Sequence, residues 1–170
     1  MKILIVRNSE SAPEGAFGAW LAAQGHEIEV IRGADLDEAA LARADLVVLL
    51  GSPHGVYDTQ IPWVAQQAPT SGICFGAQMI AAAAGGDSAR MQDGRFFRGW
   101  LGIEQAGSDI FAGPWPRWHG DAITLPPGAE LLAADAGTVQ AFALPGAIGV
   151  QFHPEATPEI MQDWAEKFTP

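Results

Sequence analysis

The sequence predicts an α/β fold with a doubly wound, mostly parallel sheet, helices on both faces and an added antiparallel hairpin region. Apolar runs at 1–6 and 45–50 do not alternate with polar residues, as expected of strands buried on both faces. A helix, a strand and a second helix are predicted between them, and this β-α-β-α-β order implies right-handed crossovers. From residue 95 onward, short strand patterns punctuated by Gly and Pro replace the helical ones, which predicts hairpins.

The first half of the chain supplies the crossover elements. Phe17, Trp20 and Leu21 recur at helical spacing on one apolar face, and Gly25 follows as a C-cap. Three further segments are predicted from their patterns: a strand at 27–31, a helix at 36–44 with Asp37 as N-cap, and a loop at 51–62 with two glycines and two prolines.

The second half begins with a helix at 75–86 that a double glycine closes. A closing helix is predicted at 157–168, with Thr157 as N-cap and Pro158 in its first turn. The short strands between these helices are predicted at 96–105, 122–125, 130–134, 139–144 and 148–152. With neither an internal repeat nor a linker in sight, we expect residues 1–170 to form one domain.

Composition excludes several function classes. The formal net charge is −11, so the chain is expected to repel nucleic acid and anionic membrane surfaces. No apolar run approaches the ~18 residues that a membrane-spanning helix needs, and the start of the chain does not resemble a signal peptide. A single cysteine cannot form an internal disulfide, which favours the cytoplasm as the compartment.

That cysteine, Cys74, lies in "GICFGAQ" (72–78), between the end of a predicted strand and the start of a helix. A glycine two residues away on each side matches a nucleophile elbow, in which a tight strand-to-helix turn exposes the nucleophile. The helix N-terminus favours thiolate over thiol, and the N–H of Phe75 would point at a developing oxyanion. Taken alone, the pattern also fits an inert buried cysteine.

A reactive thiol needs a base, and the chain has four histidines. His26 is expected at a strand edge and His54 in an exposed loop. His119 stands in "RWHGD", and His153 in "QFHPE" at the carboxyl end of an apolar strand. His153 is therefore the strongest candidate for the base.

Glu155 stands two residues after His153, on the same side of an extended segment and about 7 Å away. It can fold back toward the imidazole while Pro154 stiffens the link between them. A carboxylate in this position fixes the imidazole tautomer and stabilises its charged form. The alternative is a His-Pro turn with a solvated glutamate.

Together these motifs resemble the class I (triad) glutamine amidotransferases, whose fold is flavodoxin-like, over most of the chain. "GSPHGVYD" resembles the family's G-G-P-x-S-V-Y-D loop, "GICFGAQ" its G-I-C-x-G-x-Q elbow, and "VQFHPE" its Q-F-H-P-E ending. "WHGDAITLPPGAELLA" is similar to the S-H-G-D segment of the amidotransferase domain of GMP synthase and of stand-alone proteins like that domain.

The resemblance implies a chemistry for each motif. Cys74 would attack the side-chain amide of glutamine, His153 would carry the proton to the leaving ammonia, and Glu155 would orient His153. Water would then hydrolyse the γ-glutamyl thioester. No cofactor and no metal are implied. The other implied site residues are Phe75, Gly51 and Ser52 at the oxyanion hole, through backbone N–H groups, and Gln78, His119, Gly120 and Asp121 at the substrate.

Two departures from the family pattern affect the expected site. Ser52 stands where the family usually has a glycine, so a positive φ there would cost about 1 kcal/mol and shift an oxyanion donor. Ala77 stands where a larger residue is common, which predicts a wider pocket.

Three functional outcomes stay open at this point. The chain is expected to supply ammonia to a separate acceptor enzyme, to hydrolyse glutamine or another γ-glutamyl amide by itself, or to be a catalytically silent binding or regulatory relative. A flavodoxin-like protein acting on glyoxals or oxidised thiols is a further alternative, which "QFHPE" argues against. A cluster of aromatic residues indicates either an interface or a second core: Trp100, Phe111, Trp115 and Trp118.

Overall fold

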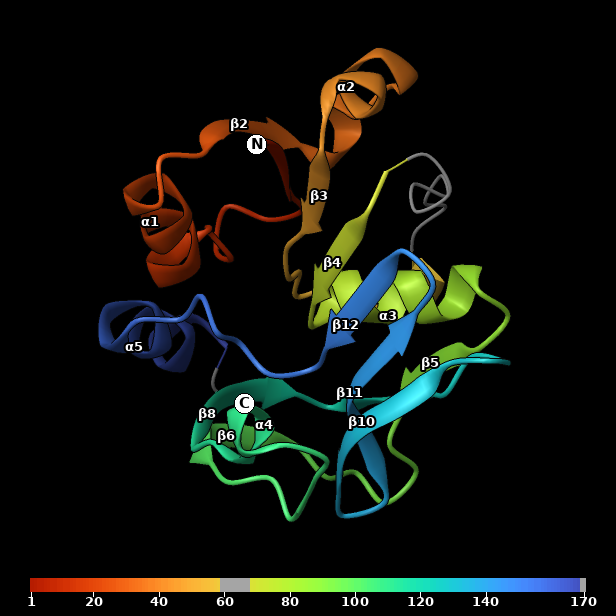
Figure 1. Cartoon of the computed structure of the whole chain (residues 1–170). Coiled ribbons are helices and arrows are strands. Elements are labelled where there is room, and N and C mark those ends of the chain that lie inside the picture. Colours follow the sequence, from red (N-terminus) through yellow and green to blue (C-terminus); the bar gives the residue numbers. More distant parts are fainter. Residues whose placement is uncertain (59–67, 169–170) are drawn as a thin grey trace.

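The computed structural model describes residues 1–58 and 68–168 and is built around one eight-stranded sheet. Figure 1 shows this sheet with its helices. The strand order is β2-β1-β3-β4-β12-β11-β10-β7; neighbours run parallel from β2 to β12 and antiparallel from β12 to β7. The strands are β1 (Lys2–Arg7), β2 (Glu27–Arg32), β3 (Leu46–Leu49), β4 (Thr70–Ile73), β7 (Gln105–Ala106), β10 (Glu130–Asp135), β11 (Thr138–Leu144) and β12 (Ala147–Val150).

The parallel strands place their side chains alternately on two faces, and both faces are covered. In β1, Ile3 and Ile5 pack on one face with Leu21 of α1 (Gly15–Ala23). Leu4 and Val6 pack on the other face, where α2 (Glu38–Arg43) and α3 (Phe75–Ala83) contribute to the core. All four β1 side chains are at most 2% exposed, so each contributes about 1.5–3 kcal/mol through burial.

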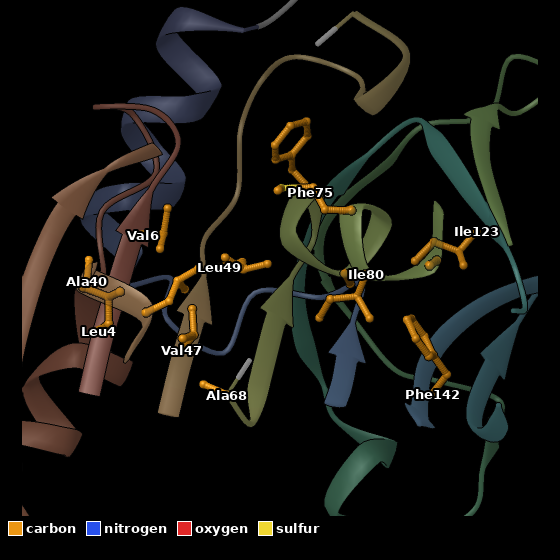
Figure 2. Close-up of a cluster of buried hydrophobic side chains, with 14 residues drawn as sticks. Leu4, Val6, Ala40, Val47, Leu49, Ala68, Phe75, Ile80, Ile123 and Phe142 are labelled. Carbon is orange, nitrogen blue, oxygen red and sulfur yellow. The ribbon is translucent and has the colours of Figure 1, made fainter. Parts of the chain in front are cut away.

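The larger core cluster includes side chains of α3 and anchors this helix on the sheet. Figure 2 shows Leu49, Phe75, Ile80, Ile123 and Phe142 among its side chains. Ile80 and Phe142 are fully buried. The helix that begins immediately after Cys74 is therefore anchored on the sheet by apolar packing.

The C-terminal helix, two ribbons and three short helical segments complete the described chain. The C-terminal helix α5 (Pro158–Lys167) begins at the Thr157 cap, whose hydroxyl accepts the N–H of Ile160. The remaining elements are the ribbon of β5 (Asp87–Arg90) and β9 (Asp121–Thr124), the ribbon of β6 (Phe97–Leu101) and β8 (Trp115–His119), α4 (Asp109–Ala112), and 3₁₀ turns at Gly33–Asp35 and Val56–Asp58.

The predicted α/β class, the parallel sheet and the hairpin region are confirmed, with corrections to individual elements. The strand expected at 96–105 is divided into β6 and β7, and the strand expected at 148–152 ends at Val150. β5, β8 and α4 were not predicted. Pro114, just before β8, and Pro116, within it, obscure the strand pattern. Among the strands of the described residues β8 pairs with β6 alone, where a missing backbone donor costs little.

Two further expectations concern exposed segments. Trp20 was expected on the buried face of α1 but is 55% exposed, stacked on Phe17 at a centroid distance of 6.1 Å. The predicted loop at 51–62 contains a 3₁₀ turn, and its residues 59–62 lie outside the described part of the chain. No helix within residues 1–58 and 68–168 is long and apolar enough to cross a membrane.

Candidate active site

Cys74 occupies a sharp turn between β4 and α3, as the glycine pattern predicts. Its φ of 51° and ψ of −108° lie in a region that side chains rarely adopt. A Cβ at Gly72 would come 2.5 Å from the carbonyl carbon of Gly76, and one at Gly76 would come 2.1 Å from the carbonyl oxygen of Leu49. Both glycines are therefore required for the helix to approach the sheet this closely.

His153 reaches the same place from the end of β12 through a turn that differs from the expected extended segment. The N–H of Ala156 donates to the carbonyl oxygen of His153 at 3.1 Å, with Pro154 in the second position of the turn. The turn brings Glu155 back, so that His153 Nδ1 lies 2.7 Å from Glu155 Oε1. Both side chains are buried, at 3% and 1% exposure.

The imidazole of His153 is held in its charged form. Burial lowers its pKa, but the Glu155 carboxylate and the Cys74 sulfur outweigh burial and raise the pKa to about 10. Within the described chain Nε2 has no well-aligned hydrogen-bond partner, which leaves this nitrogen available to a reacting group. A Cβ at Gly51 would lie 3.4 Å from His153 Cε1 and 4.0 Å from Cys74 Cβ, so Gly51 packs against both residues.

A second buried side chain contacts the sulfur, and sequence reasoning missed it. Gln151 Nε2 donates to Cys74 Sγ at 3.4 Å, and Gln78 Nε2 donates to Gln151 Oε1 at 3.4 Å. Gln151 is 1% exposed and Gln78 is 3% exposed. The only signal in the sequence was the position of Gln151 in "VQFHPE", two residues before His153.

The three predicted oxyanion residues surround Cys74. Phe75 is the first residue of α3, and Gly51 and Ser52 follow the end of β3. Within the described chain only Cys74 and Ala136 combine a side chain with positive φ, so the strain considered for Ser52 does not arise. The Ser52 hydroxyl instead accepts the N–H of His54 at 3.2 Å, which closes a small turn at the cavity edge.

Cys74 and His153 line a cavity of about 230 Å³. The "HGD" residues 119–121 lie in its wall where β8 passes into β9. Asp121 Oδ1 lies 3.4 Å from Arg90 Nε and 3.5 Å from the Tyr57 hydroxyl. Arg90 is an addition that the sequence did not indicate. Besides Cys74 and His153, the polar residues of the wall are Ser11, Ser52, His54, Gln78, Arg90, His119 and Asp121.

His119 is fixed as a neutral acceptor. Its Nδ1 donates to the carbonyl oxygen of Asp121 at 2.9 Å, which directs the lone pair of Nε2 away from that bond. Burial lowers the pKa of His119 to about 3, reinforced by the positive charges of His153 and Arg117 and only partly opposed by the bond to Asp121. The ring is therefore uncharged at neutral pH.

Aromatic side chains form another part of the wall, and Phe96 lies next to Gly120 and Arg90 of the polar part. The Trp164 and His153 rings lie 4.6 Å apart, Trp118 lies 6.1 Å from Trp164, and Phe96 lies 6.1 Å from Trp118. Phe168 lines the same cavity. We call these four residues, Phe96, Trp118, Trp164 and Phe168, the aromatic wall.

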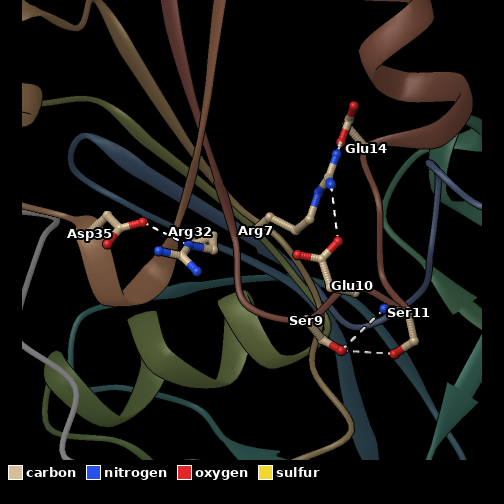
Figure 3. Close-up of polar contacts among 7 residues, drawn as sticks. All are labelled: Arg7, Ser9, Glu10, Ser11, Glu14, Arg32 and Asp35. Atoms are coloured by element: carbon tan, nitrogen blue, oxygen red, sulfur yellow. Dashed lines mark hydrogen bonds and ion pairs between the residues drawn. The ribbon is translucent and has the colours of Figure 1, made fainter.

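The loop between β1 and α1 closes the cavity beside the aromatic wall, where Ser11 is a lining residue. Ser9 Oγ bonds to Ser11 Oγ at 2.8 Å and to its backbone nitrogen at 3.2 Å (Figure 3). Arg7 pairs with Glu14 at 2.6 Å across the same loop. Trp164 Nε1 donates to the Ser11 carbonyl oxygen, which ties α5 to this loop.

The burial of side chains decides two other predictions from the sequence, the wider pocket at Ala77 and the role of the aromatic cluster. Ala77 does not widen the cavity, because it is fully buried in the core, with its Cβ 3.1 Å from where a Cβ at Gly149 would lie. The aromatic cluster is a second core except at one position. Phe111 and Trp115 pack around Phe152. Trp118 packs against the α5 cluster, whereas Trp100 is 52% exposed.

Across residues 1–58 and 68–168, no group of three or more His, Cys, Asp or Glu side chains is arranged to hold a metal ion. The site offers a cysteine sulfur, an imidazolium and a carboxylate in sequence, beside backbone donors and a cavity of small-molecule size.

The sequence matches one known protein family over most of its length. The family model for glutamine amidotransferase class-I matches residues 18–168. The chain is 39% identical over 122 residues to a GMP synthase [glutamine-hydrolyzing] of Thermomicrobium roseum, and 34% identical over 126 residues to one of Brucella melitensis. These matches cover 64% of the chain but only 23% and 25% of the two relatives, so the chain spans about a quarter of their length.

Solved structures share the fold over nearly the whole chain. A glutamine amidotransferase of Thermotoga maritima superposes with a TM-score of 0.82 at 25% identity, covering 99% of this chain and 82% of that one. A glutamine amido transferase of Methylobacillus flagellatus superposes with a TM-score of 0.78 at 24% identity, covering 97% of this chain and 74% of that one.

Proposed function

Because the chain belongs to the class I glutamine amidotransferase family, we propose that it hydrolyses the side-chain amide of L-glutamine, or of another γ-glutamyl amide, and releases ammonia or the corresponding amine. One observation carries this proposal. The elbow residue Cys74, in its strained backbone conformation, shares a cavity with a buried His153–Glu155 pair whose free nitrogen is Nε2.

The reaction begins with the sulfur of Cys74. The proton shared by Cys74 and His153 lies on Nε2, in keeping with the raised pKa of the ring, and Sγ attacks the amide carbon of the substrate as a thiolate. The carbon–nitrogen bond then breaks as His153 donates the proton to the leaving nitrogen, and a γ-glutamyl thioester remains on Cys74. Water, deprotonated by His153, hydrolyses the thioester to glutamate, and the sulfur leaves as a thiolate beside the protonated His153. Glu155 keeps Nδ1 protonated and the ring in place throughout.

The negative charge that develops on the amide oxygen is stabilised by backbone donors. Phe75 is the first residue of α3, so its N–H has no partner inside the helix and lies in the positive end of the helix dipole. We assign the second donor to the N–H groups of the Gly51–Ser52 segment, because Gly51 packs against both Cys74 and His153. Removing one such donor in other enzymes costs about 10²–10³ in rate.

The polar wall fits the amino-acid end of the substrate. The carboxylate of Asp121 suits the α-ammonium group, and the guanidinium of Arg90, 3.4 Å from it, suits the α-carboxylate. The neutral His119 Nε2 adds an acceptor, and Gly120 leaves room beside Arg90 and Phe96. Gln78 lines the same region one helical turn after Cys74.

We further propose that the ammonia is used by an acceptor enzyme supplied as a separate chain. The GMP synthases that this chain resembles are described as glutamine-hydrolyzing and are about four times longer than the matched region. The alternatives are a protein that hydrolyses the amide without an acceptor and a catalytically silent relative. The following experiment separates the catalytically silent relative from an active hydrolase.

The test measures glutamate and ammonia release from L-glutamine by the chain and by Cys74→Ala, with Ser71→Ala as a control for a small polar truncation in the preceding strand. We expect turnover by the chain and by the control, and none by Cys74→Ala. Turnover that persists in Cys74→Ala would contradict the proposed nucleophile. No turnover, together with no reaction of Cys74 with a glutamine-like electrophile, would favour the catalytically silent relative.

A further inference from the structure

The His153 ring has to keep Nε2 beside the Cys74 sulfur throughout the proposed reaction. Rotation about its side-chain bonds would carry Nε2 away, and the outer bond of an imidazole side chain has broad torsional wells. Glu155 Oε1 lies 2.7 Å from Nδ1, and a Cβ at Gly51 would lie 3.4 Å from Cε1. A further contact is Trp164, whose ring centroid lies 4.6 Å from that of the imidazole at an interplanar angle of 63°. Trp164 therefore limits the rotation that would take the base away from the nucleophile.

Trp164 can act in this way because its own side chain is fixed. The residue is 4% exposed, and its ring centroid lies 6.1 Å from that of Trp118. Its Nε1 donates to the carbonyl oxygen of Ser11, in the loop between β1 and α1. Because the indole is both buried and hydrogen-bonded, the imidazole that rests against it has little freedom to turn.

The end of the same loop holds the other member of the pair, Glu155. The N–H of Ala16 donates to the carbonyl oxygen of Glu155 at 2.8 Å. Gly15, the first residue of α1, has a φ of +46°, and a Cβ there would lie 2.1 Å from the same oxygen. Only glycine fits this position, because the backbone of α1 begins directly against the backbone of Glu155.

Residues 11–16 therefore contact both members of the base pair, directly at Glu155 and through Trp164 at His153. We propose that Trp164 and Gly15 are positioning residues of this site, through which the segment 11–16 holds the imidazole and its carboxylate in line with Cys74. Neither residue forms or breaks a bond; both reduce the motion that would separate the reacting groups. This role rests on the proposed amide hydrolysis and deepens it.

The placement has a measurable consequence at His153. Burial lowers the pKa of the ring, but the Glu155 carboxylate and the Cys74 sulfur raise it to about 10. A ring that moves away from these two partners and meets water would return toward the ordinary value of about 6.5. The pKa of His153 therefore reports whether the ring is held in place, independently of substrate turnover.

The first experiment replaces the indole in the full chain. Trp164→Leu is compared with Trp115→Leu, because Trp115 also stacks on an aromatic ring, that of Phe152 at 4.8 Å, but does not line the cavity. An NMR pH titration gives the pKa of His153, and glutamate release from L-glutamine gives kcat. We expect the pKa to fall by about one pH unit or more and kcat by about tenfold or more in Trp164→Leu only.

The second experiment replaces the glycine, with a control that carries the same backbone strain. Gly15 and Gly25 both have positive φ, at 46° and 77°, but a Cβ at Gly25 would have no neighbour within 4 Å. Gly15→Ala should lower the pKa of His153 and kcat, because the new methyl group displaces Glu155. Gly25→Ala should change neither. This pair decides the role of the segment 11–16 even if Trp164→Leu does not fold.

The outcomes separate this role from the proposed function. A His153 pKa in Trp164→Leu equal to that of Trp115→Leu would overturn the role of Trp164, and equality of the two alanine variants would overturn that of Gly15. Lowered pKa values in Trp164→Leu and Gly15→Ala, in a chain that releases no glutamate, would leave the positioning role intact and count against the proposed hydrolysis.

Discussion

The side-chain amide of Gln151 donates to the sulfur of Cys74 at 3.4 Å while its oxygen accepts from Gln78 at 3.4 Å. The sulfur is therefore held between an imidazole on one side and an amide on the other. The sequence predicts that Gln78 holds the substrate. In the structure Gln78 also donates to Gln151 and so orients the amide that contacts the Cys74 sulfur. A donor aimed at sulfur stabilises the thiolate more than the thiol, so this contact favours the nucleophilic form.

Replacing Gln151 with Leu should slow the reaction of Cys74. A hydrogen bond to a charged group contributes about 1.5–3 kcal/mol, which corresponds to a loss of roughly 10- to 100-fold in the rate of thiol alkylation at fixed pH. The matched control is Gln140→Leu, because Gln140 is equally buried on the neighbouring strand and donates to Thr138 instead. Equal alkylation rates in the two variants would refute the assigned role.

Glu155→Gln should lower both the basicity of His153 and the rate of hydrolysis. The carboxylate is the strongest influence raising the pKa of His153 to about 10, so its neutral isostere should bring the pKa down. An NMR pH titration of the ring nitrogens measures this shift directly. We expect kcat to fall about 10⁴-fold, as when the acid of a triad is made an amide. Glu159→Gln, at an exposed position, serves as the control. An unchanged pKa of His153 in Glu155→Gln would contradict the role assigned to Glu155.

Cys74→Gly should be more stable than Cys74→Ala, although both lack the thiol. The φ of 51° strains any residue with a Cβ, at a cost of about 1–2 kcal/mol that glycine does not incur. Urea unfolding of the two variants isolates this term, because the sulfur contacts are lost in both. An alanine variant as stable as the glycine variant would show that the elbow is unstrained.

Acid should destabilise the fold through His119. Its pKa is lowered to about 3 in the folded state, against about 6.5 in the unfolded chain, so the unfolded state binds more protons between these values. Its stabilising contribution is complete above pH 6.5 and is lost as the pH falls toward 3, at up to about 1.4 kcal/mol per pH unit. His119→Phe should flatten this dependence in urea unfolding between pH 7 and 4. Parallel curves for the two proteins would contradict the prediction.

The elbow was predictable because its glycines serve a steric need that is local in sequence. Gly72 and Gly76 flank Cys74 at fixed spacing, and a Cβ at either position would collide with backbone. The His153–Glu155 pair was also predictable, although a turn rather than an extended segment brings the two together.

The remaining features depend on contacts that no local pattern encodes. Arg90 reaches the cavity because β5 pairs with β9, which places it opposite Asp121. The aromatic wall combines residues from three elements, and Phe96, Trp118 and Trp164 have no common spacing. β8 was not predicted, because Pro114 and Pro116 obscure its strand pattern, although β8 carries His119 to the cavity wall.

The most direct test of the central claim is mass spectrometry of the chain after exposure to 6-diazo-5-oxo-L-norleucine, an electrophilic analogue of glutamine. If Cys74 is the nucleophile, one adduct per chain is expected on Cys74. Excess L-glutamine should slow its formation, and Glu155→Gln should slow it strongly. This readout does not require an acceptor enzyme. No adduct, or an adduct on Cys74 that glutamine does not protect, would contradict a glutamine-specific nucleophile at Cys74.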